Sequence, residues 1–365
     1  MITQIHMQDL KFLHAFNSIP GIGPVALRAL KDHFGSYDAA WCADEAALAS
    51  SPITPQALQS ILWKRPSLHP DKELGALIRE GVWAVHEDDP NYPPLLKEIP
   101  SSPAIIYGKG DVSLLNTRSI AVVGTRKPTH YGLEATEKIT QRLAEFLTIV
   151  SGLATGIDGR AHEATLDAKG KTIAVLGSGL DQNSIFPPQH RGLARRIVDA
   201  GGAVISEYPP GTPALKEHFP QRNRIVSGLS CGVLVIEAPE RSGALITARL
   251  ALEQNRDVFA LPGSIFSLYS RGPLALIKDG AKCVSSAEDI LEELGIEYNK
   301  ERAEKFTAGL GEKEKLIFEM LESPLGVDAI KAGTNLETPA IIATLSMLEL
   351  KGLVRNIGGD TYQKI

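Results

Sequence analysis

The chain has 365 residues, of which 43% are hydrophobic and 22% are charged. This composition is typical of globular proteins and excludes disordered and fibrous classes, while the length predicts two or more domains. The formal net charge of -5 argues against a protein whose whole surface binds nucleic acid. Any nucleic-acid site must therefore be local.

The three cysteines, Cys42, Cys231 and Cys283, lie far apart and form no C-x-x-C pair. This spacing is typical of neither a disulfide framework nor a zinc site. No run approaches the roughly 20 uncharged apolar residues that a membrane-spanning helix needs. We therefore expect a cytoplasmic protein with no metal site, no cofactor and no membrane segment.

The first 80 residues predict a helical domain of the SAM or helix-hairpin-helix type, with apolar periodicity at 10–16 and 25–34. The P-G-I-G turn within 19–24 resembles a helix-hairpin-helix turn, whose glycines let backbone N–H groups approach a phosphate. An ordinary tight connection between two helices has the same pattern. The sequence leaves open whether this turn contacts DNA.

Residues 81–298 alternate uniformly apolar runs with amphipathic segments, after an extended lead-in and an edge strand at 104–107. The predicted strands are 119–123, 148–150, 172–176, 203–206, 233–236, 258–261 and 282–284. The predicted helices are 133–147, 158–168, 189–200, 222–229, 243–254, 273–278 and 287–294. Apolar strands separated by amphipathic helices predict an α/β fold, an extended Rossmann-like, doubly wound parallel sheet.

The last residues predict a linker at 299–312, rich in Lys and Glu, and a winged-helix domain at 313–365. Helices at 313–321, 327–332 and 338–351 precede a terminal hairpin, which is the winged helix-turn-helix arrangement. The third helix offers only Lys351 as a cation, which is poor for DNA-groove binding. We expect this domain to contact protein or to be mildly autoinhibitory, rather than to act as a transcription regulator.

Glycines, small hydroxyls and one arginine follow three of the predicted strands, at the edge of the sheet where doubly wound folds bind ligands. Backbone N–H groups at helix N-termini together with a fixed cation suit a phosphate. The residues predicted to bind phosphate in these turns are Gly124, Thr125, Arg126, Ser151, Gly152, Gly177, Ser178 and Gly179. None of the turns matches a dinucleotide or P-loop motif, so a dehydrogenase or ATPase is disfavoured.

A second group of candidate phosphate ligands follows later strands. A predicted helix start carries two guanidinium groups in the segment Arg222, Asn223 and Arg224. Two such groups at a helix N-terminus favour an anion site. Ion pairs of these arginines with Glu207 or Glu237 are the structural alternative, and both roles can coexist. A further glycine-hydroxyl helix start adds Ser242, Gly243 and Thr247.

Two pairs of residues could suggest catalysis. Asp158 and His162 are spaced i, i+4, but a helix N-cap and a packed polar partner explain them. Glu207 and Glu237 each follow a strand, and we expect ion pairs with arginine for both. No catalytic residue is therefore predicted. The aromatic residues that could either stack on bases or pack in the core are Phe186, Tyr208 and Tyr269.

Several segments, in this order, resemble the DNA-processing protein A (DprA/Smf) family over about residues 90–295. They are V-V-G-T-R (122–126), S-G-L-A-T-G-I-D-G-R-A-H (151–162), I-A-V-L-G-S-G-L-D (173–181), F-P-Q-R-N-R-I-V-S-G-L-S (219–230), S-G-A-L-I-T-A (242–248) and F-A-L-P-G (259–263). The resemblance implies a non-enzymatic homodimer that binds single-stranded DNA, protects incoming strands during natural transformation and helps load the RecA recombinase.

One position departs from the family pattern. Many members carry lysine in a Tyr-Pro-Lys turn where this chain has Phe186, Pro187 and Pro188. That contact is lost or has moved to Arg191, and the sequence does not decide which.

The alternative function is that of an enzyme, a nucleotide phosphoribohydrolase of the lysine-decarboxylase-like group on a related Rossmann fold. Those enzymes carry a P-G-G-x-G-T segment with a nearby glutamate. This chain reads R-S-G-A-L-I-T at 241–247, without the double glycine, so the cradle for that hydrolysis is incomplete.

Overall fold

A computed structural model of the chain describes residues 4–298, 310–321, 323–334, 336–351 and 353–364. The chain forms two compact units, residues 1–296 and 297–365, and each is considered by itself. The predicted linker at 299–312 falls mostly outside the described residues. The further division of the first unit at residue 80 stays a prediction.

The chain begins with a series of short helices, several of them started by a local signal in the sequence. They are α1 (Gln4–Asn17), α2 (Pro24–Phe34), α3 (Tyr37–Cys42), α4 (Glu45–Ser50), α5 (Pro55–Lys64), η1 (Arg65–Ser67) and α6 (Pro70–Arg79). Ser36, Asp44 and Thr54 accept backbone N–H groups as N-caps of α3, α4 and α5. The buried side chains of these helices share one core with the adjoining sheet, where Leu13 and Phe16 belong to the same cluster as Tyr107.

A nine-stranded sheet forms the centre of the first unit, in the order β1-β2-β6-β5-β4-β3-β7-β8-β9. The strands are β1 (Trp83–His86), β2 (Ile105–Gly110), β3 (Ser119–Val123), β4 (Thr148–Ser151), β5 (Thr172–Leu176), β6 (Ala203–Ser206), β7 (Gly232–Val235), β8 (Asp257–Ala260) and β9 (Lys282–Cys283). Strands β1, β2 and β6 pair antiparallel, and the pairs from β6 to β9 are parallel. The predicted doubly wound α/β fold is confirmed. The predicted edge position of the strand at 104–107 is wrong, because β2 pairs with both β1 and β6 and the edge is formed by β1.

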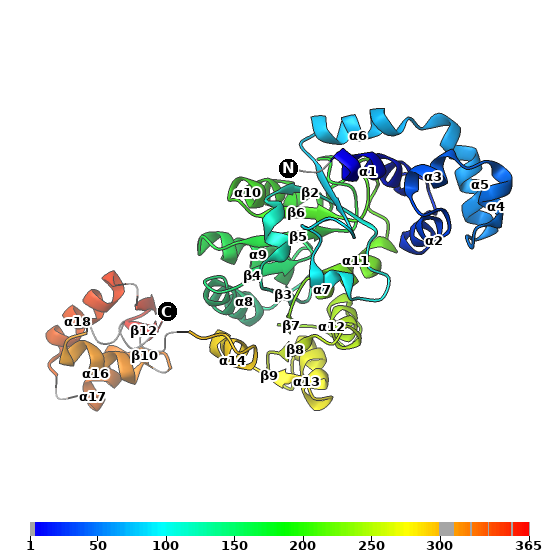
Figure 1. The fold of residues 1–365 in the computed structure, drawn as a ribbon. Coiled ribbons are helices and arrows are strands. Elements are labelled where there is room, and N and C mark those ends of the chain that lie inside the picture. Colours follow the sequence, from blue (N-terminus) through cyan, green and yellow to red (C-terminus); the bar gives the residue numbers. More distant parts are fainter. Residues whose placement is uncertain (1–3, 299–309, 322, 335, 352, 365) are drawn as a thin grey trace. The chain divides into compact units, whose positions relative to one another are not determined.

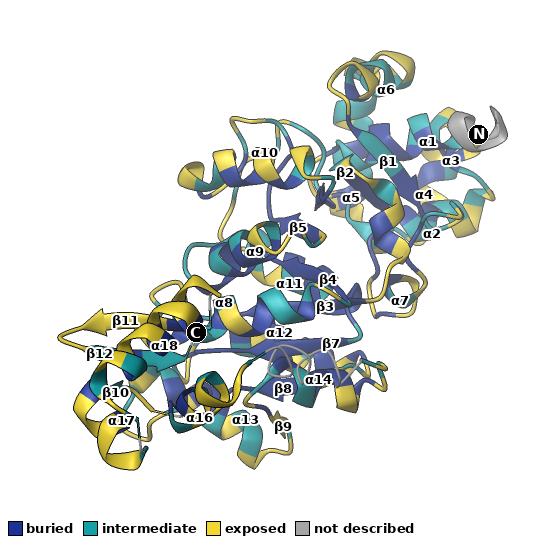
Figure 2. Ribbon diagram, turned by 90° about the vertical axis from the view of Figure 1, so that its left-hand side faces the viewer, coloured by how far each residue is buried: buried dark blue, intermediate teal, exposed yellow. Residues whose placement is uncertain are grey.

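Helices cover both faces of this sheet. They are α7 (Pro94–Lys97), η2 (Val112–Asn116), α8 (His130–Leu143), α9 (Ile157–Asp167), η3 (Pro188–His190), α10 (Arg191–Asp199), α11 (His218–Gly228), α12 (Gly243–Glu253), η4 (Leu268–Ser270), α13 (Arg271–Lys278) and α14 (Ala287–Glu293). Figure 1 shows α8, α9 and α10 along one side of the strands and α11 and α12 along the other. Strands β3, β4 and β5 are therefore buried throughout (Figure 2).

The strand order places a topological switch point beside β3. The chain runs outward from β3 through β4 and β5 to β6, then returns to place β7 on the other side of β3. The loops after β3 and β7 consequently leave the sheet in opposite directions, which opens a crevice at their carboxyl ends. Ligands of doubly wound folds bind at this place.

The second unit consists of α16 (Glu312–Met320), β10 (Leu325–Gly326), α17 (Val327–Gly333), α18 (Thr338–Leu350), β11 (Val354–Gly358) and β12 (Thr361–Lys364). Its three strands pair in the order β10-β12-β11, and Ile317, Ile341 and Leu345 belong to a separate core cluster. The predicted winged helix is confirmed. Lys351, at the end of α18, forms an ion pair with Glu314 at 2.7 Å, so it is not freely available to a DNA groove.

Two features are not found among the described residues. No helix in the described part of the chain combines the length and the apolar character that crossing a bilayer requires. Within the same residues, no group of three or more His, Cys, Asp or Glu side chains is arranged to hold a metal ion.

Candidate functional site

A cavity of about 950 Å³ opens at the carboxyl ends of β3, β4 and β7, and we call it the crevice. Segments far apart in the sequence meet here, as the switch point requires. The predicted residues that line the crevice are Gly124, Thr125, Arg126, Gly152, Arg222, Asn223, Ser242, Gly243 and Thr247.

The turn after β3 is held rigidly by its neighbours. A Cβ at Gly124 would lie 2.5 Å from Ile157 Cγ1 and 3.0 Å from the Glu237 carbonyl oxygen, so only glycine fits. The Thr125 backbone N–H donates to that same carbonyl at 2.7 Å, and the Thr125 carbonyl accepts from Ile157 N at 3.2 Å. This anchoring directs the next side chain, Arg126, into the crevice.

Arg126 is exposed and lines the crevice. Its guanidinium lies 5.7 Å from the centre of the Phe219 ring, and no carboxylate of the described residues lies within ion-pair distance of it. Asp181, which could have held this arginine, instead accepts from Gly211 N at 2.6 Å and from Ser184 Oγ at 2.8 Å. Arg126 is thus a positioned cation without a protein counter-ion in the described part of the chain.

Arg222 combines a structural role with a place in the crevice wall. It is only 5% exposed, and its Nη1 donates to the carbonyl oxygens of Gly152, at 2.6 Å, and of Val175. The buried Asp158 carboxylate accepts from Gly152 N at 3.2 Å beside it. Burial lowers the pKa of Arg222 to about 10 and raises that of Asp158. Arg222 therefore ties the ends of β4 and β5 together.

The second arginine of this segment lies outside the crevice lining. Arg224 pairs with Glu207 at 2.5 Å and donates to the Ser101 carbonyl at 2.9 Å, which confirms the expected ion pair of Glu207. The expected arginine partner of Glu237 is wrong, because that carboxylate accepts from the backbone N–H and the hydroxyl of Thr129, at 2.8 and 2.6 Å. Glu237 therefore holds Thr129, the N-cap residue of α8, in place.

Four more predicted residues lie away from the crevice. The Ser151 hydroxyl donates to the Val122 carbonyl at 2.6 Å and is buried. The turn containing Gly177, Ser178 and Gly179 is covered by the chain itself, because Gly179 N donates to the Thr212 carbonyl at 2.8 Å. This turn therefore faces protein.

Three cations that sequence reasoning left out also line the crevice: Lys127, Lys216 and Arg241. All three are exposed, and none has an ion-pair partner among the described residues. Asp158 is the one carboxylate in the lining, and it is buried. Lys127 could have been found from its place next to Arg126, whereas Lys216 lies in a loop that carries no recognisable pattern.

Aromatic rings lie beside these cations. The rings of Phe186 and Phe219 have centres 5.6 Å apart, and Phe186 is 43% exposed. Tyr269 also lines the crevice. Tyr208 instead stacks on His218, with ring centres 4.0 Å apart, and lines another cavity.

Comparison with known proteins agrees with this architecture. Residues 83–295 match the family described as DNA recombination-mediator protein A, and residues 307–360 match the DprA winged helix domain. The chain belongs to the DNA recombination-mediator protein A family. The resemblance stated from the sequence motifs is confirmed, and the phosphoribohydrolase alternative is not favoured.

Relatives within this family cover most of the chain. Protein Smf of Synechocystis is 37% identical over 96% of this chain and 97% of its own length. The X-ray structure of DNA processing protein A from Streptococcus pneumoniae superposes with a TM-score of 0.67 at 36% identity, covering 82% of this chain and 99% of that one. The protein from Helicobacter pylori, described for its single-stranded DNA binding mode, gives a TM-score of 0.53 at 30% identity, covering 58% and 95%.

Arg191, the candidate replacement for the family's turn lysine, points elsewhere. Its Nη2 donates to the Asn183 carbonyl at 2.7 Å. The side chain lines a cavity of about 190 Å³ together with Lys109 and Arg195. Arg191 therefore does not enter the crevice of this family member.

The Asp158 and His162 pair is built for packing rather than for proton transfer. His162 is fully buried, with Nδ1 2.7 Å from the Thr172 hydroxyl. Burial lowers its pKa to about 3, so the imidazole stays neutral. Gly156, and not Asp158 as expected, occupies the N-cap of α9, because Asp158 lies inside the first turn and binds Gly152 N.

Proposed function

We propose that the protein mediates recombination by binding single-stranded DNA in the crevice. The observation that carries the proposal is the set of exposed cations around this cavity, Arg126, Lys127, Lys216 and Arg241, which have no ion-pair partner among the described residues. In a chain with a net charge of -5, such a local concentration of positive charge is suited to an anionic backbone. The α12 N-terminus adds backbone donors at Ser242 and Gly243.

The aromatic rings support a single strand over a duplex. The rings of Phe186 and Phe219 lie beside Arg126. A nucleotide whose phosphate binds the guanidinium therefore has its base close to these rings. Only an unpaired base offers its face for stacking. The lining supplies cations and backbone donors that recognise phosphate, which favours binding without sequence preference.

Fluorescence anisotropy with labelled oligonucleotides, single-stranded and duplex, tests this function. We expect a clear preference for the single strand, with log affinity falling against log salt by about 0.7 per phosphate neutralised. Equal affinity for both forms, or a salt-independent affinity, would contradict the proposal.

We further propose that the protein performs no catalysis of its own. Glu207 and Glu237, the carboxylates at the strand ends, are engaged by Arg224 and Thr129. ATP, NAD and nucleoside monophosphates should therefore be recovered unchanged after incubation with the pure protein. Repeated turnover that disappears in Glu237→Gln would reassign the protein to the enzymes.

The family resemblance supports three further proposals: a homodimer, loading of RecA, and protection of incoming strands during natural transformation in the cytoplasm. Residues 81–298 would carry the DNA site. For the dimer, the loop after β8 exposes Ile265 by 73% and Phe266 by 93%. Sedimentation velocity should show a dimer, and Phe266→Asp should weaken it.

For RecA loading, RecA should form filaments faster on single strands already bound by this protein than on free strands.

A further inference from the structure

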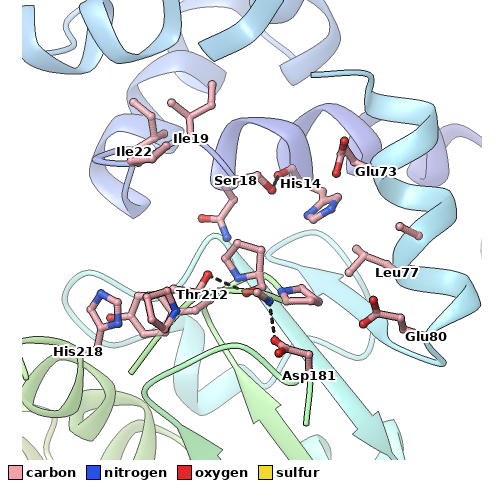
Figure 3. A pocket seen from close by; sticks show the side chains of 18 of the residues that line it. His14, Ser18, Ile19, Ile22, Glu73, Leu77, Glu80, Asp181, Thr212 and His218 are labelled. Carbon is pink, nitrogen blue, oxygen red and sulfur yellow. Dashed lines mark hydrogen bonds between the residues drawn. The ribbon is translucent and has the colours of Figure 1, made fainter. Parts of the chain in front are cut away.

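A second large cavity, of about 900 Å³, lies between the first helices and the loop after β6. We call it the acidic cleft. Figure 3 shows Glu73, Leu77 and Glu80 on one side of it, from α6 and its C-terminal end, and Asp181, Thr212 and His218 on the other. The rest of the segment 208–213 continues the side on which Thr212 lies, and α1 with the turn at 19–22 forms a further wall.

The charge of the acidic cleft is opposite to that of the crevice. Glu73, Glu80 and Asp181 are its charged lining residues, and neither Lys nor Arg lines it. Asp181 is engaged by Gly211 and Ser184, whereas Glu73 and Glu80 have no partner among the described residues. Three carboxylates repel a phosphate and attract a cation. Nucleic acid is therefore the wrong ligand for this cavity.

The side chain of a largely buried histidine lines the same space. His14 is 4% exposed and lines the cleft, and its Nδ1 lies 2.9 Å from the Tyr107 hydroxyl. That hydroxyl accepts from Asn17 Nδ2 at 3.1 Å. Donation of its own proton to His14 Nδ1 is the arrangement that gives this buried phenol proton an acceptor. The ring proton of His14 then resides on Nε2, which has no acceptor among the described residues.

The acidic lining favours a neutral ligand group as the acceptor for this N–H, because carboxylates repel an anion. Burial lowers the pKa of His14 to about 4, so the ring is uncharged near neutral pH and Nε2 offers a single N–H. Burial also raises the pKa of Tyr107, which keeps the phenol protonated. A peptide carbonyl is a neutral acceptor that suits this N–H.

The size and the walls of the cleft suit several residues of extended chain. Ile19, Ile22, Leu77 and Leu215 supply apolar contacts, and a cavity of this volume holds much more than one side chain. The prolines at 209, 210 and 213 fix part of the wall, so little conformational entropy is lost there on binding.

We propose that the acidic cleft binds a short, extended segment of a partner protein that carries lysine or arginine between apolar residues. Glu73 and Glu80 bind the cation, the aliphatic side chains pack on Leu77 and Leu215, and His14 Nε2 donates to a carbonyl of the segment. The proposal concerns a surface separate from the crevice and does not depend on DNA binding.

The test uses the full chain and the fluorescein-labelled peptide Gly-Leu-Arg-Gly-Leu-Arg, with Gly-Leu-Glu-Gly-Leu-Glu as its matched control. We expect binding of the arginine peptide alone, weakened about tenfold in the double variant Glu73→Gln and Glu80→Gln. Glu45→Gln removes the same kind of charge from exposed α4, outside the cleft, and should leave the affinity unchanged. Ala76→Phe fills the cleft without altering its charge and should abolish binding.

Three outcomes would overturn the proposal. They are absence of binding, equal weakening by Glu45→Gln, and full affinity in a folded Ala76→Phe protein. Complete displacement of the peptide by spermidine at equal charge concentration would make the cleft a polyamine site instead. Affinity for a single-stranded oligonucleotide, measured on the same preparations, should stay unchanged in the double variant Glu73→Gln and Glu80→Gln. Failure of the peptide proposal is therefore distinct from failure of the DNA proposal.

Discussion

Replacing Arg126 by alanine should weaken binding of a single-stranded oligonucleotide by about tenfold to a hundredfold. A charge-assisted hydrogen bond to phosphate contributes roughly 1.5–3 kcal/mol, and Arg126 has no carboxylate partner among the described residues to reduce that contribution. Fluorescence anisotropy over a series of salt concentrations measures both consequences. The salt slope should fall by about 0.7, because one phosphate contact is lost.

Two further variants separate recognition from general charge. Arg126→Lys should recover only part of the affinity, because an ammonium group lacks the bidentate fork. Arg196→Ala removes an exposed arginine of α10 that does not line the crevice, and it should bind as the unaltered protein does. A well-folded Arg126→Ala protein with full affinity would mean that DNA does not lie in the crevice.

Replacing Arg222 by alanine should destabilise the first unit by about 3–5 kcal/mol, because it removes two hydrogen bonds from a buried charged group, each of which contributes roughly 1.5–3 kcal/mol. The substitution leaves the carbonyls of Gly152 and Val175 without their donor, and it leaves the buried Asp158 without its neighbouring positive charge. Differential scanning calorimetry should show the transition of this unit at a lower temperature.

A second substitution identifies the cause of that loss. Asp158→Asn in the Arg222→Ala background removes the uncompensated charge, so the double variant should recover part of the lost stability. Arg196→Ala should melt as the unaltered protein does. An unchanged transition temperature in Arg222→Ala would show that the arginine contributes to ligand binding alone.

The fold could be predicted because its strands are buried on both faces. Ser119–Val123 and Thr172–Leu176 are largely apolar runs, and such runs, separated by helices, are typical of the central strands of a parallel sheet. Strand β1 could not be predicted, because Trp83–His86 is short and only partly buried and its pairing with β2 depends on a long-range contact. The helix α11 begins before the predicted residue, because Pro220 lies in its first turn, where proline is tolerated.

The candidate site could be predicted only in part. A glycine-rich turn indicates a backbone that a ligand can approach, but the local sequence does not show whether another loop of the chain covers that turn. The turn at 177–179 is as rich in glycine and small hydroxyls as the turn that begins at 124, yet the loop containing Thr212 covers it. Conversely, Lys216 reaches the crevice through a loop between β6 and α11. Nothing in the local pattern indicates where that loop goes.

That loop, together with the start of α11, lines both cavities. Leu215 and His218 line the acidic cleft, while Lys216 and Phe219 line the crevice. A peptide in one cavity and a DNA strand in the other would bind to opposite sides of one backbone segment. When both ligands prefer particular conformations of this segment, the binding of one changes the affinity for the other, and the change must be equal in both directions. Bound DNA would then recruit a partner protein that prefers the same conformation, and that partner would in turn promote the capture of DNA.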